Sequence, residues 1–460
     1  MKIKQGFILL WLLAGLVTAA YAAWEPAYAI VNCRIVPVAG DPVEDGTIIK
    51  AGRLFDSEKG VFLDNQYITV LKNRVVSVDA SMKDPKGANV IDLGRYTVLP
   101  GLIDCHTHLL FLEKIGRQGS GLSAESVASL VFEGDALRAL HGAARAKTFL
   151  EAGITTVQDL GNSGQFADIA LRRAIEDGSV AGCRMRVSGP GLSAEGGQIP
   201  GLIYRHLPLV NDEYRIVRGV DDAVAAVREN FTMRVDLIKI YADNAPNVAR
   251  LSVEEMAAIV QEAHRYGLRV AAHAVSEKSI RDAALAGVDS IEHAYSLSDE
   301  TIQLLKEKNI FVVPTLMSSD CFARYMEISG EADKDVIKKQ FQSMQERSRD
   351  VLQRLMKSGI TIASGSDDYI DLNMPQGQGA KKVLFAYAEC GMGVLDILKT
   401  TSINAARQLR LEDRIGVIKK GAFADIIAVE GNLEKDIRVL DNIRFVMKDG
   451  KIYVDPPAGR

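Results

Sequence analysis

The chain has 460 residues, of which 47% are hydrophobic and 25% are charged, and its net charge is −4. This length is sufficient for one large hydrophobic core and a second, smaller one. Charges of both signs are mixed along the chain, without a basic stripe or an acidic tail. Nucleic-acid binding therefore has no electrostatic support, and we expect no nucleic-acid partner.

Residues 1–22 have the pattern of a secretory signal peptide. Lys2 and Lys4 precede an uncharged apolar stretch, and Ala20 and Ala22 form an A-x-A cleavage signal. The apolar stretch is almost long enough to span a bilayer, so an uncleaved membrane anchor is the alternative. We expect cleavage after Ala22 and export to the periplasm or the medium, with no membrane attachment afterwards.

The five cysteines are scattered and do not have the spacing of a metal site. An odd number in an exported chain excludes a complete set of intrachain disulfides. We expect most of them to be small, buried apolar residues. They are Cys33, Cys105, Cys183, Cys321 and Cys390.

Short runs rich in Val, Ile and Tyr occupy residues 23–98, and similar runs return in residues 411–460. Gly, Asp and Asn separate these runs, which is typical of β-strands. The simplest architecture pairs the two ends of the chain in one small β-sandwich domain. The runs cover residues 28–38, 46–55, 66–79, 416–431 and 443–454.

Between them, residues 99–410 alternate short apolar runs with helical segments. One helical segment begins with a capping box formed by Ser252 and Glu255 and ends at Gly267. Eight apolar strands separated by helices predict an α/β fold, a (β/α)8 TIM-like barrel. A doubly wound open sheet is the alternative, but it normally carries a G-x-G-x-x-G loop, which this sequence lacks. The eight runs cover residues 101–108, 154–161, 183–193, 236–243, 269–276, 290–296, 311–316 and 361–368.

Polar residues with metal-binding side chains follow five of these strands. The active sites of such barrels lie at the carboxyl ends of the strands, so we expect these side chains to converge. Because side chains alternate along a strand, His106 and His108 point to the same face. Imidazole and carboxylate are ligands for zinc-like ions. The candidate ligands are His106, His108, Lys239, His273, His293 and Asp367.

Lys239 is the unusual member of this set, because a buried ammonium ion among imidazoles is costly. One solution is carboxylation by CO2, which would make Lys239 a carbamate that bridges two metal ions. A lysine with its stem buried and its ammonium in water is the simpler alternative for this residue taken alone.

Seven segments of the chain together resemble the amidohydrolase superfamily, most closely its imidazolonepropionase-like branch, which includes Xaa-Pro dipeptidases. The resemblance covers nearly all of the chain after the signal segment. The segments are "LPGLIDCHTHL", "AGITTVQDLG", "IKIYAD", "AAHAVS", "GVDSIEHAYS", "ASGSDD" and "GVIKKGAFADIIAV".

The resemblance implies a centre with two divalent ions, for which we expect zinc. His106, His108 and Asp367 would bind the more buried ion, and His273 and His293 the more exposed one. Carboxylated Lys239 would bridge both ions. Asp367 is preferred to the adjacent aspartate because it aligns with the Asp of the family's G-T-D motif.

Two divalent ions that share a water lower its pKa and supply hydroxide near neutral pH. Asp367 can then move a proton from the nucleophile to the leaving group. Tyr241 lies two residues after Lys239 and should face the same way. By resemblance its hydroxyl would bind the substrate carbonyl or carboxylate, although a packed barrel tyrosine is an equal alternative.

The substrate-binding residues are less well defined. The dipeptidase branch often has T-G-G-H after strand three, whereas this chain reads "SAEGGQIP" with Gln198 in place of the histidine. Gln198 donates a hydrogen bond but offers no charge to a carboxylate. Further candidate contacts are His141, Arg205 and His206, and Arg215 and Arg218 are other cations near Arg205. The Gly-rich residues 369–382 are a candidate lid.

Three functions are compatible with these observations. We favour an exported metal-dependent amidohydrolase that cleaves a peptide or N-acyl amino acid, with a small molecule or dipeptide as substrate. The alternatives are a cyclic amide or imidazolone ring hydrolase with a single metal, and a non-catalytic metal-binding barrel. A homo-oligomer is compatible with the sequence.

Overall fold

The computed structural model describes residues 46–82, 88–114, 122–199, 201–245, 247–331 and 333–455. The expected signal peptide, the run 28–38 and Cys33 lie outside the described residues. The other four cysteines are free and buried, as predicted for small apolar residues.

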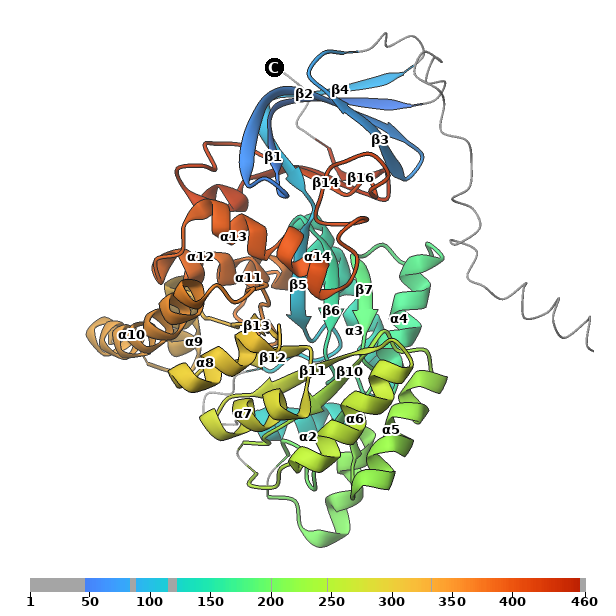
Figure 1. Cartoon of the computed structure of the whole chain (residues 1–460), viewed down its shortest axis with the longest axis vertical. Coiled ribbons are helices and arrows are strands. Elements are labelled where there is room, and N and C mark those ends of the chain that lie inside the picture. Colours follow the sequence, from blue (N-terminus) through green and yellow to red (C-terminus); the bar gives the residue numbers. More distant parts are fainter. Residues whose placement is uncertain are drawn as a thin grey trace, which may run out of the picture.

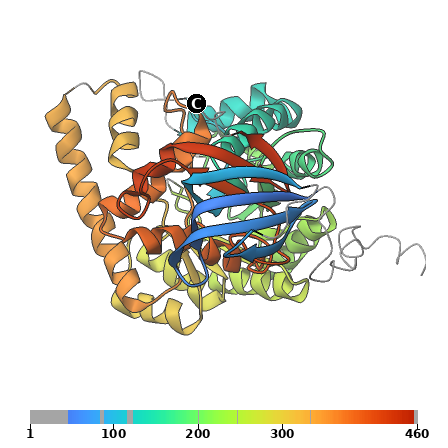
Figure 2. The ribbon, with the colours of Figure 1, turned by 90° about the horizontal axis from the view of Figure 1, so that it is seen from above.

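Both ends of the described chain contribute to one mixed seven-stranded sheet, at the top of Figure 1 and across the centre of Figure 2. Its order is β16-β15-β14-β4-β1-β2-β3, in which β1 and β4 are parallel and β14 joins β4 antiparallel. The predicted pairing of the two chain ends is therefore present as a single sheet. Its strands are β1 (Thr47–Asp56), β2 (Val61–Leu71), β3 (Arg74–Asp79), β4 (Asn89–Pro100), β14 (Ile426–Val429), β15 (Ile443–Lys448) and β16 (Lys451–Val454).

The nine intervening strands form two parallel sheets, ordered β5-β6-β7 and β13-β12-β11-β10-β8-β9. Helices alternate with them along the chain, so the fold is α/β. The strands are β5 (Leu102–Thr107), β6 (Ile154–Asp159), β7 (Arg184–Val187), β8 (Gly191–Ser193), β9 (Tyr214–Ile216), β10 (Leu237–Tyr241), β11 (Arg269–Ala274), β12 (Ser290–His293) and β13 (Phe311–Val313).

Helices surround the parallel strands, and α10 extends along one side of the molecule (Figure 1, Figure 2). The predicted capping box is present: Ser252 and Glu255 cap α6 reciprocally, and α6 ends just before Gly267. None of the described helices is long and apolar enough to cross a membrane. The helices are α2 (Leu122–Phe132), α3 (Gly134–Glu151), α4 (Ala167–Glu176), α5 (Val220–Thr232), α6 (Val253–Arg265), α7 (Glu277–Ala286), α8 (Asp299–Glu307), α9 (Ser319–Ile328), α10 (Lys334–Ser358), α11 (Gln376–Ala380), α12 (Lys382–Glu389), α13 (Val394–Thr400) and α14 (Ile403–Gln408), with 3-10 helices at η1 (Tyr204–Asp212) and η2 (Ile437–Asp441).

Two of the eight predicted barrel strands differ from the prediction. The third run divides into β7 and β8, because Gly189 has a positive φ of 63° and Pro190 has no N–H for a ladder. The eighth run, residues 361–368, is not a strand. Its backbone nevertheless bonds to both parallel sheets: Val312 N donates to Thr361 O, and Cys105 N donates to Ser364 O, at 3.2 and 2.8 Å. This segment thus lies between β13 and β5.

Candidate metal centre

A cavity of about 70 Å³ lies at the carboxyl ends of the parallel strands. All six candidate metal ligands line it, and so do Tyr241 and Gln198. These side chains therefore converge, as expected from their positions at the ends of strands, although they are separated by up to about 260 residues in the sequence.

His106, His108 and Asp367 form a group that could hold a metal ion, because one ligand atom from each lies within 4.8 Å of the others. Asp367 Oδ1 is 3.1 Å from His108 Nε2 and 3.6 Å from His106 Nε2. Its neighbour Asp368 instead points toward Gly379, where a Cβ would lie 2.7 Å from the carboxylate. The preference for Asp367 over Asp368 agrees with this placement.

A second pair of imidazoles completes the cavity. His273 Nδ1 and His293 Nε2 face each other at 2.8 Å, and His293 packs against the ring of His106 with centroids 4.9 Å apart. In the parallel ladder, Tyr241 of β10 is the partner of His273 of β11, and Ala274 of β11 is the partner of His293 of β12. The candidate ligands His273 and His293 therefore lie at adjacent strand ends.

Each imidazole has one nitrogen next to an outer partner, which leaves the other nitrogen directed into the cavity. Such outer partners fix the tautomer and the orientation of metal-binding histidines. The pairs are His106 Nδ1 with Glu292 Oε2 at 2.8 Å, His108 Nδ1 with Gly161 O at 3.2 Å, His273 Nε2 with Asp243 Oδ1 at 3.2 Å, and His293 Nδ1 with Thr315 Oγ1 at 2.8 Å.

Burial keeps these imidazoles in the form that binds metal. It lowers the pKa of His106, His273 and His293, so they are neutral near pH 7. Burial alone would raise the pKa of Asp367, but His106 and His108 outweigh it and hold that pKa below its usual value. Three of the imidazoles are therefore neutral and Asp367 is a carboxylate, and these donors suit a divalent transition metal.

Lys239 is 1% exposed and lines the same cavity, so the alternative of a lysine with its ammonium in water does not hold. Burial lowers the pKa of its amine, against the opposing effect of the Glu292 and Asp367 carboxylates. A neutral amine is the form that reacts with CO2, so this environment is compatible with a carbamate.

Two of the candidate ligands have unusual backbone conformations. His293 and Asp367 have φ of 76° and 54°, in the left-handed region that non-glycine residues rarely adopt. Gly365 makes the approach of this segment to β5 possible, because a Cβ there would lie 2.6 Å from His106 Cβ. Such strain is held by the surrounding fold and concentrates at functional sites.

Tyr241 faces the cavity as predicted, and its hydroxyl donates to Asn162 Oδ1 at 3.1 Å. Gln198 Nε2 lies 3.3 Å from His273 Nε2, so this residue is next to one of the candidate metal ligands.

Three other expected substrate contacts lie elsewhere. His141 is on α3, 3.8 Å from Glu133, because the helix turns it away from the strand ends. Arg205 and His206 are exposed in η1 and bond to each other at 3.2 Å. Arg215 and Arg218 are also engaged, the first with Asp222 and Glu229 and the second with Glu195. None of these side chains lines the cavity.

Sequence reasoning missed Glu292, Asn162 and Tyr214, although each contributes to the site. Glu292 precedes His293, so strand alternation would turn it away from the site. The positive φ at His293 breaks this alternation, and both side chains face inward. The signal for Asn162 was its position directly after "VQDLG" at a strand end.

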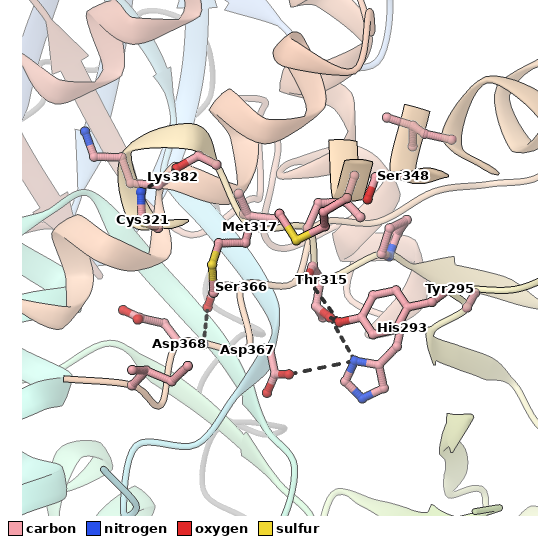
Figure 3. A pocket seen from close by; sticks show the side chains of 18 of the residues that line it. His293, Tyr295, Thr315, Met317, Cys321, Ser348, Ser366, Asp367, Asp368 and Lys382 are labelled. Carbon is pink, nitrogen blue, oxygen red and sulfur yellow. Dashed lines mark hydrogen bonds and ion pairs between the residues drawn. The ribbon is translucent and has the colours of Figure 1, made fainter. Parts of the chain in front are cut away.

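A larger cavity of about 410 Å³ adjoins the first and shares His293, Asp367 and Tyr369 with it. Figure 3 shows it from close by, with His293 and Asp367 at one end. The predicted lid, residues 369–382, contributes part of its wall. A small cavity lined by the candidate ligands therefore lies next to a larger one.

The sequence model of the Amidohydrolase family matches residues 97–453. The chain belongs to the amidohydrolase family. Ochratoxinase from Aspergillus niger is 29% identical over 464 residues, which cover 95% of this chain and 92% of the relative. Imidazolonepropionase from Deinococcus deserti is 25% identical and covers 82% of this chain and 88% of its own length. Membership makes this chain a hydrolase of amide-type bonds.

The chain is also similar to a solved structure of a hydrolase of this kind. A Xaa-Pro dipeptidase with methionine bound in its active site has a TM-score of 0.76 and 28% identity, and the match covers 89% of this chain and all of that one. The similarity to amidohydrolases of this kind therefore extends over the α/β part and the seven-stranded sheet.

Proposed function

We propose that this amidohydrolase uses two divalent metal ions, zinc being the first candidate, to hydrolyse the amide bond of a peptide or an N-acyl amino acid. The observation that carries the proposal is the convergence of four imidazoles, Asp367 and the buried Lys239 on one cavity. His106, His108 and Asp367 would hold one ion, and His273 and His293 the other. Lys239, as a carbamate, would join them.

The donor set fits such ions. The inward nitrogens of His273 and His293 lie 2.8 Å apart, and each imidazole has an outer partner on its other nitrogen, as is typical of metal-binding histidines. Bound divalent ions would supply a nucleophilic water near neutral pH and polarise the carbonyl of the scissile bond.

The chain's own residues would provide proton transfer and orientation. Asp367 is ionised at neutral pH, lies beside both cavities, and can take a proton and give it to the leaving nitrogen. The Tyr241 hydroxyl, held by Asn162, would orient the substrate from the opposite side. Gln198 would add a neutral hydrogen bond next to His273.

We further propose that the parallel strands and residues 361–368 together form a closed TIM-like barrel, with β1–β4 and β14–β16 as the small β-domain. The hydrogen bonds of residues 361–368 to β13 and β5 support this arrangement. For the N-terminal segment we propose cleavage after Ala22 and export, on the pattern of residues 1–22; N-terminal sequencing of the chain isolated from cells tests this.

The experiment that tests the function measures the metal content of the purified chain and the release of free amino acid from dipeptides and N-acyl amino acids. Two ions per chain and release of an amino acid support the proposal. One ion together with opening of an imidazolone ring would favour the imidazolonepropionase-type activity. A metal-free chain without activity would favour a non-catalytic role.

Lys239→Ala is the sharpest variant for the two-metal arrangement. We expect it to lose both ions and the activity, because the shared ligand is removed. Lys147→Ala, which changes a lysine with a 61% exposed side chain, is the matched control and should keep both. Retention of two ions in Lys239→Ala would contradict the bridging carbamate.

A further inference from the structure

The 410 Å³ cavity beside the metal centre has the size of a small-molecule site, for which about 300–1,000 Å³ is typical. The 70 Å³ chamber is by contrast just large enough for ions and a few waters. A substrate whose amide lies at Asp367 can therefore place its bulk in the larger cavity, which Asp367 also lines.

One face of α10 forms a wall of this cavity. Met344, Ser348, Val351, Leu352 and Leu355 recur at intervals of three and four residues, so they share one side of the helix. Four of the five are apolar. Met344 and Val351 are not fully buried, which leaves apolar surface that a ligand would cover.

The opposite wall adds further apolar and aromatic surface. Met317 projects into the centre of the cavity in Figure 3, and Leu316 and Val383 also line it. Tyr295 is held by a contact between its hydroxyl and Thr315 Oγ1 at 2.8 Å, yet the residue is 47% exposed. Its ring is thus fixed at one end and has free surface for an aromatic group.

Charged groups are placed at the edges. Lys382 Nζ is 2.8 Å from Asp441 Oδ2, so its charge is compensated outside the cavity. Arg347 is exposed on α10, while Asp367 and Asp368 lie at the metal end. Between these charged groups, Met344, Val351 and Leu352 of α10 and Met317 form a wall without charge.

We propose that this cavity is the specificity pocket of the enzyme and that it takes a bulky apolar, preferably aromatic, group attached to the scissile amide. Val351 and Met344 of α10 set the size of the group that fits. The proposal rests on the metal-dependent amidohydrolase function above and adds the substrate class to it.

Binding of two hydroxamates to the metal-loaded enzyme tests the pocket without requiring turnover. Acetohydroxamate and 3-phenylpropionohydroxamate share the metal-binding head and differ in the apolar tail. We expect the phenyl compound to bind about 30-fold more tightly by calorimetry, because its ring is removed from water. Val351→Trp and, independently, Met344→Trp should fill the pocket and reduce this ratio to about threefold or less.

Glu346→Trp is the matched control, because Glu346 is exposed on α10 and does not line the cavity. It should keep the wild-type ratio, and all variants should keep the metal content and the melting temperature within a few degrees. Equal binding of the two hydroxamates to the wild type, or a ratio unchanged in both pocket variants, overturns the pocket. Failure of either hydroxamate to bind the metal-loaded wild type instead overturns the proposed metal-dependent function.

Discussion

At the scale of single residues, the site depends on two backbone conformations that cost energy. The left-handed φ values of His293 and Asp367 each cost on the order of 1–3 kcal/mol in a non-glycine residue. Glu292 lies on the same face of β12 as Ser290, as strand alternation requires, and reaches His106. The left-handed φ at His293 breaks this alternation at the end of the strand, where the His293 imidazole lines the cavity.

Asp367→Asn separates metal binding from proton transfer. An amide keeps the shape and one oxygen, so we expect most of the metal to remain. It cannot accept the proton, so kcat should fall by about 10²–10⁴-fold. Asp396→Asn on the surface of α13 is the control, since that side chain is 62% exposed. A near-normal kcat in Asp367→Asn would remove this residue from proton transfer.

Glu292→Gln tests the orientation of His106. Glu292 is fully buried, contacts His106 Nδ1 at 2.8 Å and accepts from Ser290 Oγ at 2.6 Å. Replacing its carboxyl group with an amide should weaken metal binding by about 10–100-fold, because His106 loses the partner that orients its ring. Titration against a competing chelator measures this, and Glu300→Gln, on an exposed residue, should have no effect. Unchanged affinity in Glu292→Gln would show that the neutral amide suffices.

The sequence identified the six side chains that line the small cavity as candidate ligands because their signal is local: a polar side chain at the end of an apolar strand. Glu292 and Asn162 could not be found this way. Their roles depend on a strained φ and on the approach of separate loops, which strand periodicity does not report. The expected contacts rested on weak signals: a loop position for His206, a positive charge for Arg205 and a helix start for His141. In the structure none of these side chains lines either cavity.

At the scale of elements, prediction succeeded where capping and periodicity agree. The box of Ser252 and Glu255 marks the start of α6 at the expected residue. The prediction of a single strand over residues 183–193 was wrong. The run of strand-like residues continues past Gly189 and Pro190, but the extended backbone is interrupted there. The cavity wall on α10 was also not predicted, because its open side depends on what the helix packs against.

The junction of α11 and α12 contains a buried lysine whose protonation affects stability. Lys381 is 1% exposed and donates to Leu440 O at 2.8 Å, and burial lowers its pKa to about 8 from 10.5. Between these values the unfolded chain binds a proton that the folded chain lacks. The free energy of unfolding therefore gains about 3 kcal/mol as the pH rises through this window.

Lys381→Met should abolish that gain. We would measure the free energy of unfolding of the variant and the wild type by chemical denaturation at several pH values between about 8 and 10.5. The contributions of the other titrating groups cancel in the difference between the two chains. Lys306→Met, on the surface of α8, should leave the pH dependence unchanged. Parallel stability curves for wild type and Lys381→Met would contradict the assignment.

At the scale of the whole molecule, the seven-stranded sheet and the parallel strands are joined by an ion network. Arg184 of β7 pairs with Asp425, just before β14, and with Asp449 at 2.6 Å, after β15. Its guanidinium also stacks over the ring of Phe423, 4.4 Å from the centroid. The sequence predicted that the strands of both chain ends pair, but not the residues that attach their sheet to the parallel strands.

Arg184→Met should destabilise the molecule by about 3–5 kcal/mol, because it leaves Asp425, 2% exposed, as an uncompensated buried charge. Adding Asp425→Asn to this variant should restore part of the loss, since the orphaned charge is then removed. Arg173→Met, on the exposed side of α4, is the control. Denaturant midpoints measure all four chains. A loss below about 1 kcal/mol, or no recovery in the double variant, would mean that apolar packing rather than this network joins the two parts.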